Sequence, residues 1–453
     1  MSMSDVLRQA LKLVEPTQNE IDSVNKVAKR AFALVKETSS KFNGVVDVLF
    51  GGSYAKDTWL RGDVDIDIFV KVRPDISEQE FEKIGKELGM LALKKYKPYL
   101  RYSEHPYVEA LVDDIRVNVV PCYDVEKGKW KSAADRSPFH TKFVKESLDG
   151  EKKREVCLLK KFMKTIGVYG AEIATHGFSG YVCEVLVLKY GSCMKVLQAA
   201  AEFKEKQVIS MESVNEDIVK LFNSAIIIID PIDSRRNLGT AISDESVGRV
   251  ILAARRFVAK PSIKFFNNIS VKKDLKFADD VILIKFNYNK RSPDIIWGQL
   301  KSSVKAVAKQ LSIHGFKVIR YTASTDEKGS AVFAFMLESI QLPQMIVRHG
   351  PKVFDPNDSE KFLEKNRENS KMIWVGDDAR LFALLDNKFV NAVTFLKYLL
   401  SKNITSSGIS TGLSRDIRKG FQIYNGKKLK SMNEGFAREA IGELVATDQF
   451  AFG

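Results

Sequence analysis

An alternating run of apolar and acidic residues constrains the fold of this chain more than any other feature. In Val64-Asp65-Ile66-Asp67-Ile68-Phe69-Val70 a period of two places both aspartates on one face of a strand. The two carboxylates then lie about 7 Å apart along the strand, within reach of one pair of divalent cations. A solvated edge strand can alternate in the same way. The apolar residues on both sides indicate instead a sheet interior, where neighbouring anions repel unless a cation lies between them.

A glycine turn precedes the acidic strand. The β-branched run of residues 45–50 ends at Gly51-Gly52-Ser53, and residues 56–60 are expected to begin a helix. Without side chains at the two glycines, a phosphate can approach the main chain and the helix N-terminus behind it. Such a turn alone is more often purely structural. Followed by paired aspartates, it predicts a phosphate-binding loop beside a metal site.

Length and composition indicate a modular globular protein. The chain has 453 residues, of which 45% are hydrophobic and 28% charged. Domains of about 100 to 200 residues predict roughly three of them, and the composition excludes a disordered or fibrous protein. Four cysteines among apolar neighbours, without a CxxC pair, are expected to be buried thiols rather than zinc ligands. They are Cys122, Cys157, Cys183 and Cys193.

The basic charge is concentrated in the C-terminal part. With 71 Lys and Arg against 57 Asp and Glu the net charge is +14, which favours a polyanionic partner such as nucleic acid or an acidic membrane surface. Residues 1–260 contribute +4 (41 basic, 37 acidic) and residues 261–453 contribute +10 (30 basic, 20 acidic). The sequence shows no signal peptide and no apolar stretch near the ~18 residues of a membrane span. A cytoplasmic protein without a membrane partner is expected.

Six motifs resemble a known family in their order and spacing. The chain resembles the archaeal class I CCA-adding enzymes, which are tRNA nucleotidyltransferases of the polymerase-beta-like superfamily. The resemblance is specific to about residue 237 and looser beyond. The motifs are GGSYAKDTWLRGDVDIDIF, YSEHPYV, VNVVPCY, KSAADRSPFH, GVYGAE and GFSGYVCE.

The resemblance implies an activity and its partners. Enzymes of this family add C, C and A to the 3′ end of tRNA without a nucleic-acid template. They use CTP and ATP, release pyrophosphate, work by a mechanism with two Mg²⁺ ions and are commonly homodimers. How CTP and ATP are chosen in order is not visible in the sequence.

The resemblance also implies an α+β, multi-domain architecture. A nucleotidyltransferase head with a mixed β-sheet is expected over residues 1–143, and a mostly helical, nucleotide-binding neck over residues 144–259. An RNA-binding α/β body would comprise residues 260–305 and 408–453. A tail over residues 306–407 would bind the acceptor and TΨC region of tRNA. The net charge of +10 in the C-terminal part agrees with contacts of Lys and Arg side chains to RNA phosphates.

The resemblance also implies site residues, position by position. Asp65, Asp67 and Asn118 occupy the catalytic and metal-binding positions. Hydroxyl and ammonium groups suit phosphate oxygens, and a planar guanidinium can hydrogen-bond a base edge. The implied nucleotide-binding residues are Gly52, Ser53, Lys56, Ser137, Lys160, Tyr169 and, facing the base, Arg236. His105 and His140 lie in family motifs without an assigned role, whereas His176, His314 and His349 are expected to be packing or surface residues.

Asn118 departs from the family pattern, which has a third catalytic carboxylate there. That carboxylate ligates metal and can take the proton of the attacking 3′-hydroxyl, whereas an amide has neither charge nor basicity. Asp114 shares a face with Asn118 but lies ~13 Å away along a continuous strand, and Asp113 points to the other face. Asn118 is either a deliberate inactivating substitution or the mark of a naturally weakened transferase. On either interpretation, Asn118→Asp should raise turnover at least ~10²-fold.

Two other functions stay open at this point. The first is a poly(A) polymerase or an oligoadenylate synthetase-like transferase of the same fold, which incorporation of CTP into tRNA would exclude. The second is a catalytically inactive RNA-binding pseudo-transferase, which Asn118 keeps open.

Overall fold

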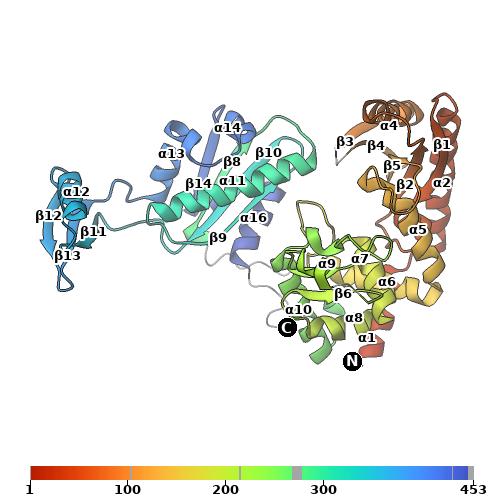
Figure 1. Ribbon diagram of the computed structural model, residues 1–453, viewed down its shortest axis with the longest axis horizontal. Helices are drawn as coiled ribbons and strands as arrows, with labels where there is room; N and C mark the ends of the chain where they lie inside the picture. Colours follow the sequence, from red (N-terminus) through yellow and green to blue (C-terminus); the bar gives the residue numbers. More distant parts are fainter. Residues whose placement is uncertain (1, 103–104, 214–215, 268–277, 431, 447–453) are drawn as a thin grey trace. The chain divides into compact units, whose positions relative to one another are not determined.

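The computed structural model describes residues 2–102, 105–213, 216–267, 278–430 and 432–446. It confirms an α+β chain and divides into two compact units, Met1–Val271 and Lys272–Thr447 (Figure 1). None of the helices in the described ranges is long and apolar enough to cross a membrane.

A five-stranded mixed sheet forms the head of the first unit. Its order is β1-β2-β5-β4-β3, with β2 and β5 parallel and the other neighbours antiparallel. The strands are β1 (Val45–Gly51), β2 (Asp65–Val72), β3 (Tyr99–Tyr102), β4 (Pro106–Val112) and β5 (Ile115–Tyr123).

Two helices cover one face of this sheet, α2 (Gln18–Ser39) and α4 (Glu78–Ala92) (Figure 1). Apolar residues of both helices share a core with Ile66 and Ile68, which are fully buried. The predicted alternation of β2 is therefore confirmed, and its aspartates belong to the opposite face. A capping-box pattern at Ser77 and Glu80 predicts a helix that runs to about Lys97. The structure confirms the N-cap, because the Ser77 side chain accepts from the Glu80 N–H, but α4 already ends at Ala92.

A helical neck completes the first unit. One core joins α1 (Met3–Val14), α6 (Gly150–Thr165), α7 (Gly180–Tyr190), α8 (Cys193–Ala201) and α10 (Asp244–Ala259). A two-stranded parallel sheet, β6 (Gln207–Ile209) and β7 (Ile226–Ile228), accompanies them, with the short α9 (Glu216–Lys220). Two further helices are α3 (Gly52–Lys56), directly after β1, and α5 (Arg136–Ser147). All four cysteines are buried and unpaired, as predicted.

The second unit is built on a four-stranded antiparallel sheet of order β14-β8-β10-β9. Its strands are β8 (Val281–Asn287), β9 (Val318–Thr325), β10 (Ser330–Leu337) and β14 (Phe421–Asn425). One face packs against α11 (Pro293–Ile313), α13 (Ala392–Lys402) and α14 (Thr411–Ile417). The other face packs against α15 (Gly426–Lys430) and α16 (Gly435–Val445). The apolar patterns of the sequence predict strands over residues 281–288, 318–324 and 331–337 and a helix over residues 295–311. The structure confirms all four.

A second, three-stranded sheet of the same unit was not predicted. Its order is β11-β13-β12, from β11 (Met345–Lys352), β12 (Ser370–Val375) and β13 (Arg380–Asp386), with α12 (Pro356–Asn366) beside it. Strand β11 has one buried residue, Gly350, and no position of β12 is buried. Strands without a buried face carry no apolar alternation, so the sequence offered no signal for them.

Candidate active site

The face of the head sheet opposite the helices carries a row of polar residues. Asp67 on β2 is the register partner of Asn118 on β5, and Asn118 is the partner of Glu109 on β4. Asn118 Nδ2 donates to Asp67 Oδ1 over 2.9 Å. Next to this row, Arg116 Nη1 lies 3.5 Å from Oδ2 of its register partner Asp65. The structure thus brings together the three residues predicted to bind metal.

Electrostatics at this row favour a bound cation. Burial raises the pKa of Asp65 to about 6, against the opposing charge of Arg116. Burial also raises the pKa of Asp67, against the hydrogen bond from Asn118. The Asn118 Oδ1 atom is buried and has no hydrogen-bond partner among the described residues. Burial disfavours the ionised form of both carboxylates, and the Asn118 carbonyl oxygen lacks a hydrogen-bond donor. Because Mg²⁺ prefers oxygen ligands, these three groups fit such an ion.

The glycine turn contacts this row directly. Gly51, the last residue of β1, is in register with Asp67. Gly52 has a φ of 63°, and a Cβ atom on it would lie 1.8 Å from Asp67 Oδ2. Helix α3 begins at Gly52 and ends at Lys56, and its C-cap is Asp57, whose φ is 55°. The helix expected over residues 56–60 therefore lies earlier, and Ser53 sits in its first turn.

Lys56 and Lys160 share one buried carboxylate, Glu184 of α7. Lys56 Nζ lies 2.6 Å from Glu184 Oε2. Lys160 Nζ donates to Glu184 Oε1 (3.1 Å), to the Thr58 carbonyl oxygen (2.9 Å) and to Thr58 Oγ1 (3.0 Å). Burial opposes ionisation of Glu184, but the two lysines lower its pKa to about 2. Direct contact of Lys160 with a phosphate would require it to exchange one of these partners.

Tyr169 and Lys160 approach the start of α7. A Cβ on Gly180, the first residue of that helix, would lie 3.0 Å from the Tyr169 hydroxyl and 3.4 Å from Lys160 Nζ. Burial raises the pKa of Tyr169 to about 12, so its hydroxyl stays protonated. The structure therefore places both predicted phosphate ligands at one helix N-terminus, which favours anions.

Helix α5 connects to the loop that carries Arg236. Ser137 lies in the first turn of α5, and His140 Nε2 lies 2.9 Å from Asp230 Oδ2. Arg236 Nη1 donates to the same oxygen (3.3 Å), and the Tyr181 hydroxyl donates to Asp230 Oδ1 (3.1 Å). The rings of His140 and Tyr181 stack at 3.9 Å. Burial lowers the pKa of His140, against the pull of Asp230.

Sequence reasoning missed three residues of this region: Glu184, Asp230 and Glu109. Glu184 did leave a signal, because it is the one carboxylate in the apolar stretch of α7, and a buried charge needs a partner. The pairing of Glu109 with Asn118 depends on strand register, which one sequence does not give.

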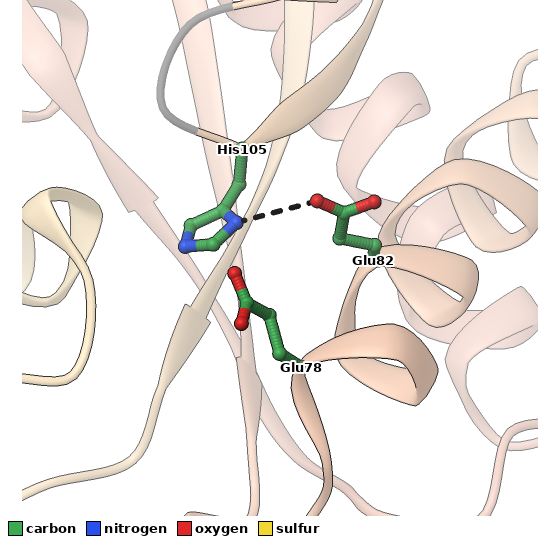
Figure 2. Close-up of side chains that lie close together, drawn as sticks. All are labelled: Glu78, Glu82 and His105. Carbon is green, nitrogen blue, oxygen red and sulfur yellow. Dashed lines mark ion pairs between the residues drawn. The ribbon is translucent and has the colours of Figure 1, made fainter.

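Three other potential metal ligands lie close together on the helix-covered side of the head. The ligand atoms of Glu78, Glu82 and His105 lie within 4.8 Å of one another (Figure 2). His105 Nδ1 is 3.6 Å from Glu82 Oε1, and Lys86 Nζ is 3.2 Å from Glu82 Oε2. Because the Lys86 ammonium group already neutralises the Glu82 carboxylate, we assign no metal ion to this cluster.

Comparison with known proteins agrees with this geometry. Three family models match: the nucleotidyltransferase domain (residues 33–147), the second domain of tRNA nucleotidyltransferase (residues 154–267) and the C-terminal domain of CCA-adding enzyme (residues 278–426). Among solved structures, a Cid1 RNA terminal uridylyl transferase has 11% identity and a TM-score of 0.47, covering 60% of this chain and all of its own. The CdnC protein of E. coli has 17% identity and a TM-score of 0.44, covering 59% and 95%. These two low scores support no conclusion.

Curated relatives match over most of their length. The CCA-adding enzyme of Saccharolobus solfataricus is 37% identical over 391 residues, which are 86% of this chain and 90% of the relative. That of Pyrobaculum islandicum is 35% identical over 408 residues, 88% and 94% of the two chains. The family expected from the sequence motifs is thereby confirmed, and the chain belongs to the CCA-adding enzymes, a family of tRNA nucleotidyltransferases.

Proposed function

We propose that this chain adds C, C and A to the 3′ end of tRNA without a nucleic-acid template, using CTP and ATP and releasing pyrophosphate. One observation carries the proposal: Asp65 and Asp67 share the face of the head sheet opposite α2 and α4, and Asp67 contacts the glycine turn that begins α3. A triphosphate on that turn and a metal ion on the aspartates would be adjacent.

In this proposal Asp65, Asp67 and the Asn118 carbonyl oxygen hold two Mg²⁺ ions. When bound, the ions supply Lewis-acid stabilisation of the charge that develops on the triphosphate. The 3′-hydroxyl oxygen of tRNA attacks the α-phosphorus, and the bond to the bridging oxygen breaks. Pyrophosphate leaves with that electron pair, and the hydroxyl proton passes to a carboxylate.

The nucleotide would lie between head and neck within the first unit. Ser53 and Ser137, each in the first turn of a helix, provide hydroxyls to phosphate oxygens. Lys56, Lys160 and Tyr169 supply buried positive charge and a protonated hydroxyl beside them. Arg236, 38% exposed and anchored on Asp230 through Nη1, presents a planar guanidinium group that can meet a base edge.

The tRNA would lie on the body (residues 260–305 and 408–453) and the tail (residues 306–407). Residues 261–453 carry +10 of the net charge, and phosphate contacts by Lys and Arg recognise an RNA helix by its shape. We also propose a homodimer acting in the cytoplasm, as the family implies. Light scattering coupled to size-exclusion chromatography tests the dimer.

Incorporation of labelled nucleotides tests the activity. With a tRNA that ends at the discriminator base, CTP, ATP and Mg²⁺, we expect products one, two and three nucleotides longer. A tRNA that already ends in CCA is the matched control and should not grow. Long tails from ATP alone would contradict the proposal in favour of a poly(A) polymerase. Binding of tRNA without incorporation would favour the pseudo-transferase that Asn118 keeps open.

A further inference from the structure

Glu109 is a buried carboxylate on the face of the head sheet opposite α2 and α4. It is 3% exposed and pairs in register with Asn118, which pairs in turn with Asp67. Residues opposite one another on neighbouring strands share a face, with Cβ atoms about 5 Å apart. Asp67, Asn118 and Glu109 therefore form one row across three strands.

This row contains the negative charge that position 118 lacks. Asn118 offers an oxygen atom without charge, and carboxylates stand on both sides of it. The Asn118 Oδ1 atom, buried and without a partner among the described residues, lies within this row.

The present partners of Glu109 are groups that a metal ion can replace. It accepts hydrogen bonds from the Tyr99 hydroxyl and from Arg101 Nε (3.1 Å). Arg116 lies between the two acids, with Nε 4.0 Å from Glu109 Oε1 and Nη1 3.5 Å from Asp65 Oδ2. Glutamate is one methylene longer than aspartate, so rotation about its side-chain bonds turns the carboxylate from Tyr99 towards Asn118.

We propose that Glu109 supplies the third carboxylate of the active site from the neighbouring strand, in place of an aspartate at position 118. The inference rests on the proposed function, because a transferase is what needs this group. Glu109 adds negative charge to the oxygen set around the metal ions. It also accepts the proton of the 3′-hydroxyl as that oxygen bonds to the α-phosphorus and pyrophosphate leaves, and then passes the proton to solvent. The chain as given is then fully active, contrary to the expectation drawn from Asn118 alone.

A structural role for Glu109, holding Tyr99 and Arg101 in place, is the competing explanation. Glutamine has the same shape and still accepts hydrogen bonds, so Glu109→Gln removes the charge while keeping the packing. Four proteins separate the two roles: the chain as given, Glu109→Gln, Asn118→Asp and the double variant. Glu126→Gln, which removes an exposed carboxylate of the head, is the matched control for loss of charge.

Rates of CMP incorporation into tRNA give the first readout. We expect Glu109→Gln to lower the rate at least ~100-fold. The double variant, with its carboxylate moved to position 118, should recover to within about tenfold of the chain as given. A loss below tenfold in Glu109→Gln overturns the proposal, and so does a loss that Asn118→Asp does not rescue.

Metal binding gives a readout that needs no turnover. Free Mn²⁺, followed by its electron paramagnetic resonance signal, is titrated against each protein with a non-hydrolysable CTP analogue. Glu109→Gln should bind Mn²⁺ at least about tenfold more weakly, and the double variant should recover. Equal affinities overturn the proposal. If even Asn118→Asp incorporates no nucleotide, the proposed function fails, whereas the Mn²⁺ titration still decides the role of Glu109.

Discussion

At the scale of single residues, Asp65 places a charge where the fold does not favour it. Its pKa is raised by burial to about 6, above the usual 3.8. The unfolded chain therefore loses this proton first, and the free energy of unfolding falls as pH rises from about 4 to 6. Catalytic carboxylates are commonly held at such a cost until a metal ion arrives.

Asp65→Asn should therefore stabilise the metal-free protein. The shift is discounted because the Asp65 side chain is 44% exposed, so we expect a gain of about 1 kcal/mol at pH 7.5 and none near pH 4. Unfolding in urea at the two pH values, with and without Mg²⁺, measures it. Mg²⁺ should raise the free energy of unfolding of the unchanged chain. The stability difference between that chain and Asp65→Asn should therefore become smaller. A variant less stable than the parent at pH 7.5 without Mg²⁺ would contradict this account.

The pKa of Glu184 is lowered rather than raised, so its contribution to stability changes with pH in the opposite direction. Although burial opposes its charge, Lys160 and Lys56 lower its pKa to about 2, so its contribution is present above about pH 4.5 and is lost as pH falls towards 2. Glu184→Gln leaves two buried ammonium groups uncompensated and should cost about 3 to 5 kcal/mol of unfolding free energy at neutral pH. Denaturant unfolding measures this cost. Glu151→Gln, on the exposed surface of α6, is the control and should change stability by less than ~0.5 kcal/mol.

The sequence predicted residues whose chemistry is local and missed those defined by pairing. Period two placed Asp65 and Asp67 on one face, and family motifs singled out Ser137 and Arg236. Glu109 and Glu184 gain their meaning from a neighbouring strand and a neighbouring helix. Register and helix packing are tertiary properties, and no periodicity within one segment contains them.

At the scale of elements, the turn from β1 into α3 determines where Asp67 can lie. A Cβ on Gly52 would lie 1.8 Å from Asp67 Oδ2, and the φ of 63° strains any other residue. Gly52→Ala should displace the carboxylate and lower activity at least ~100-fold, since a shift of about 1 Å at a catalytic centre has that effect. The loss of stability should be about 1 to 3 kcal/mol.

Gly62 provides a matched control for that substitution. Its φ is 69°, and nothing lies within 4 Å of a Cβ built there. Gly62→Ala should lose about 1 kcal/mol of stability from backbone strain while keeping its activity. Incorporation rates and urea unfolding of the two variants measure both effects. Equal loss of activity in both would show that backbone strain, rather than the contact with Asp67, is responsible.

Elements with one buried face followed from the sequence, and the others did not. Strands β8 and β10 and helix α11 were predicted nearly at their observed bounds because each buries an apolar face in a core. The sheet of β11, β12 and β13 was missed because two of its strands are mostly exposed. Apolar periodicity records burial, so it cannot reveal strands that bury little.

At the scale of the whole molecule, the uneven charge predicts how tRNA binding responds to salt. Since residues 261–453 hold +10 of the +14, tRNA affinity should fall at least ~10-fold between 50 and 200 mM KCl through counterion release. Replacing four exposed lysines of the tail by glutamine should weaken tRNA binding at low salt. It should also make the tRNA affinity depend less steeply on the KCl concentration. Replacing four exposed lysines of the head by glutamine is the control, and this change should weaken tRNA binding less. Filter binding measures the tRNA affinity of both variants. Equal losses of affinity would contradict a tRNA-binding surface centred on the C-terminal part. The tail set is Lys352, Lys361, Lys365 and Lys371, and the head set is Lys26, Lys29, Lys94 and Lys95.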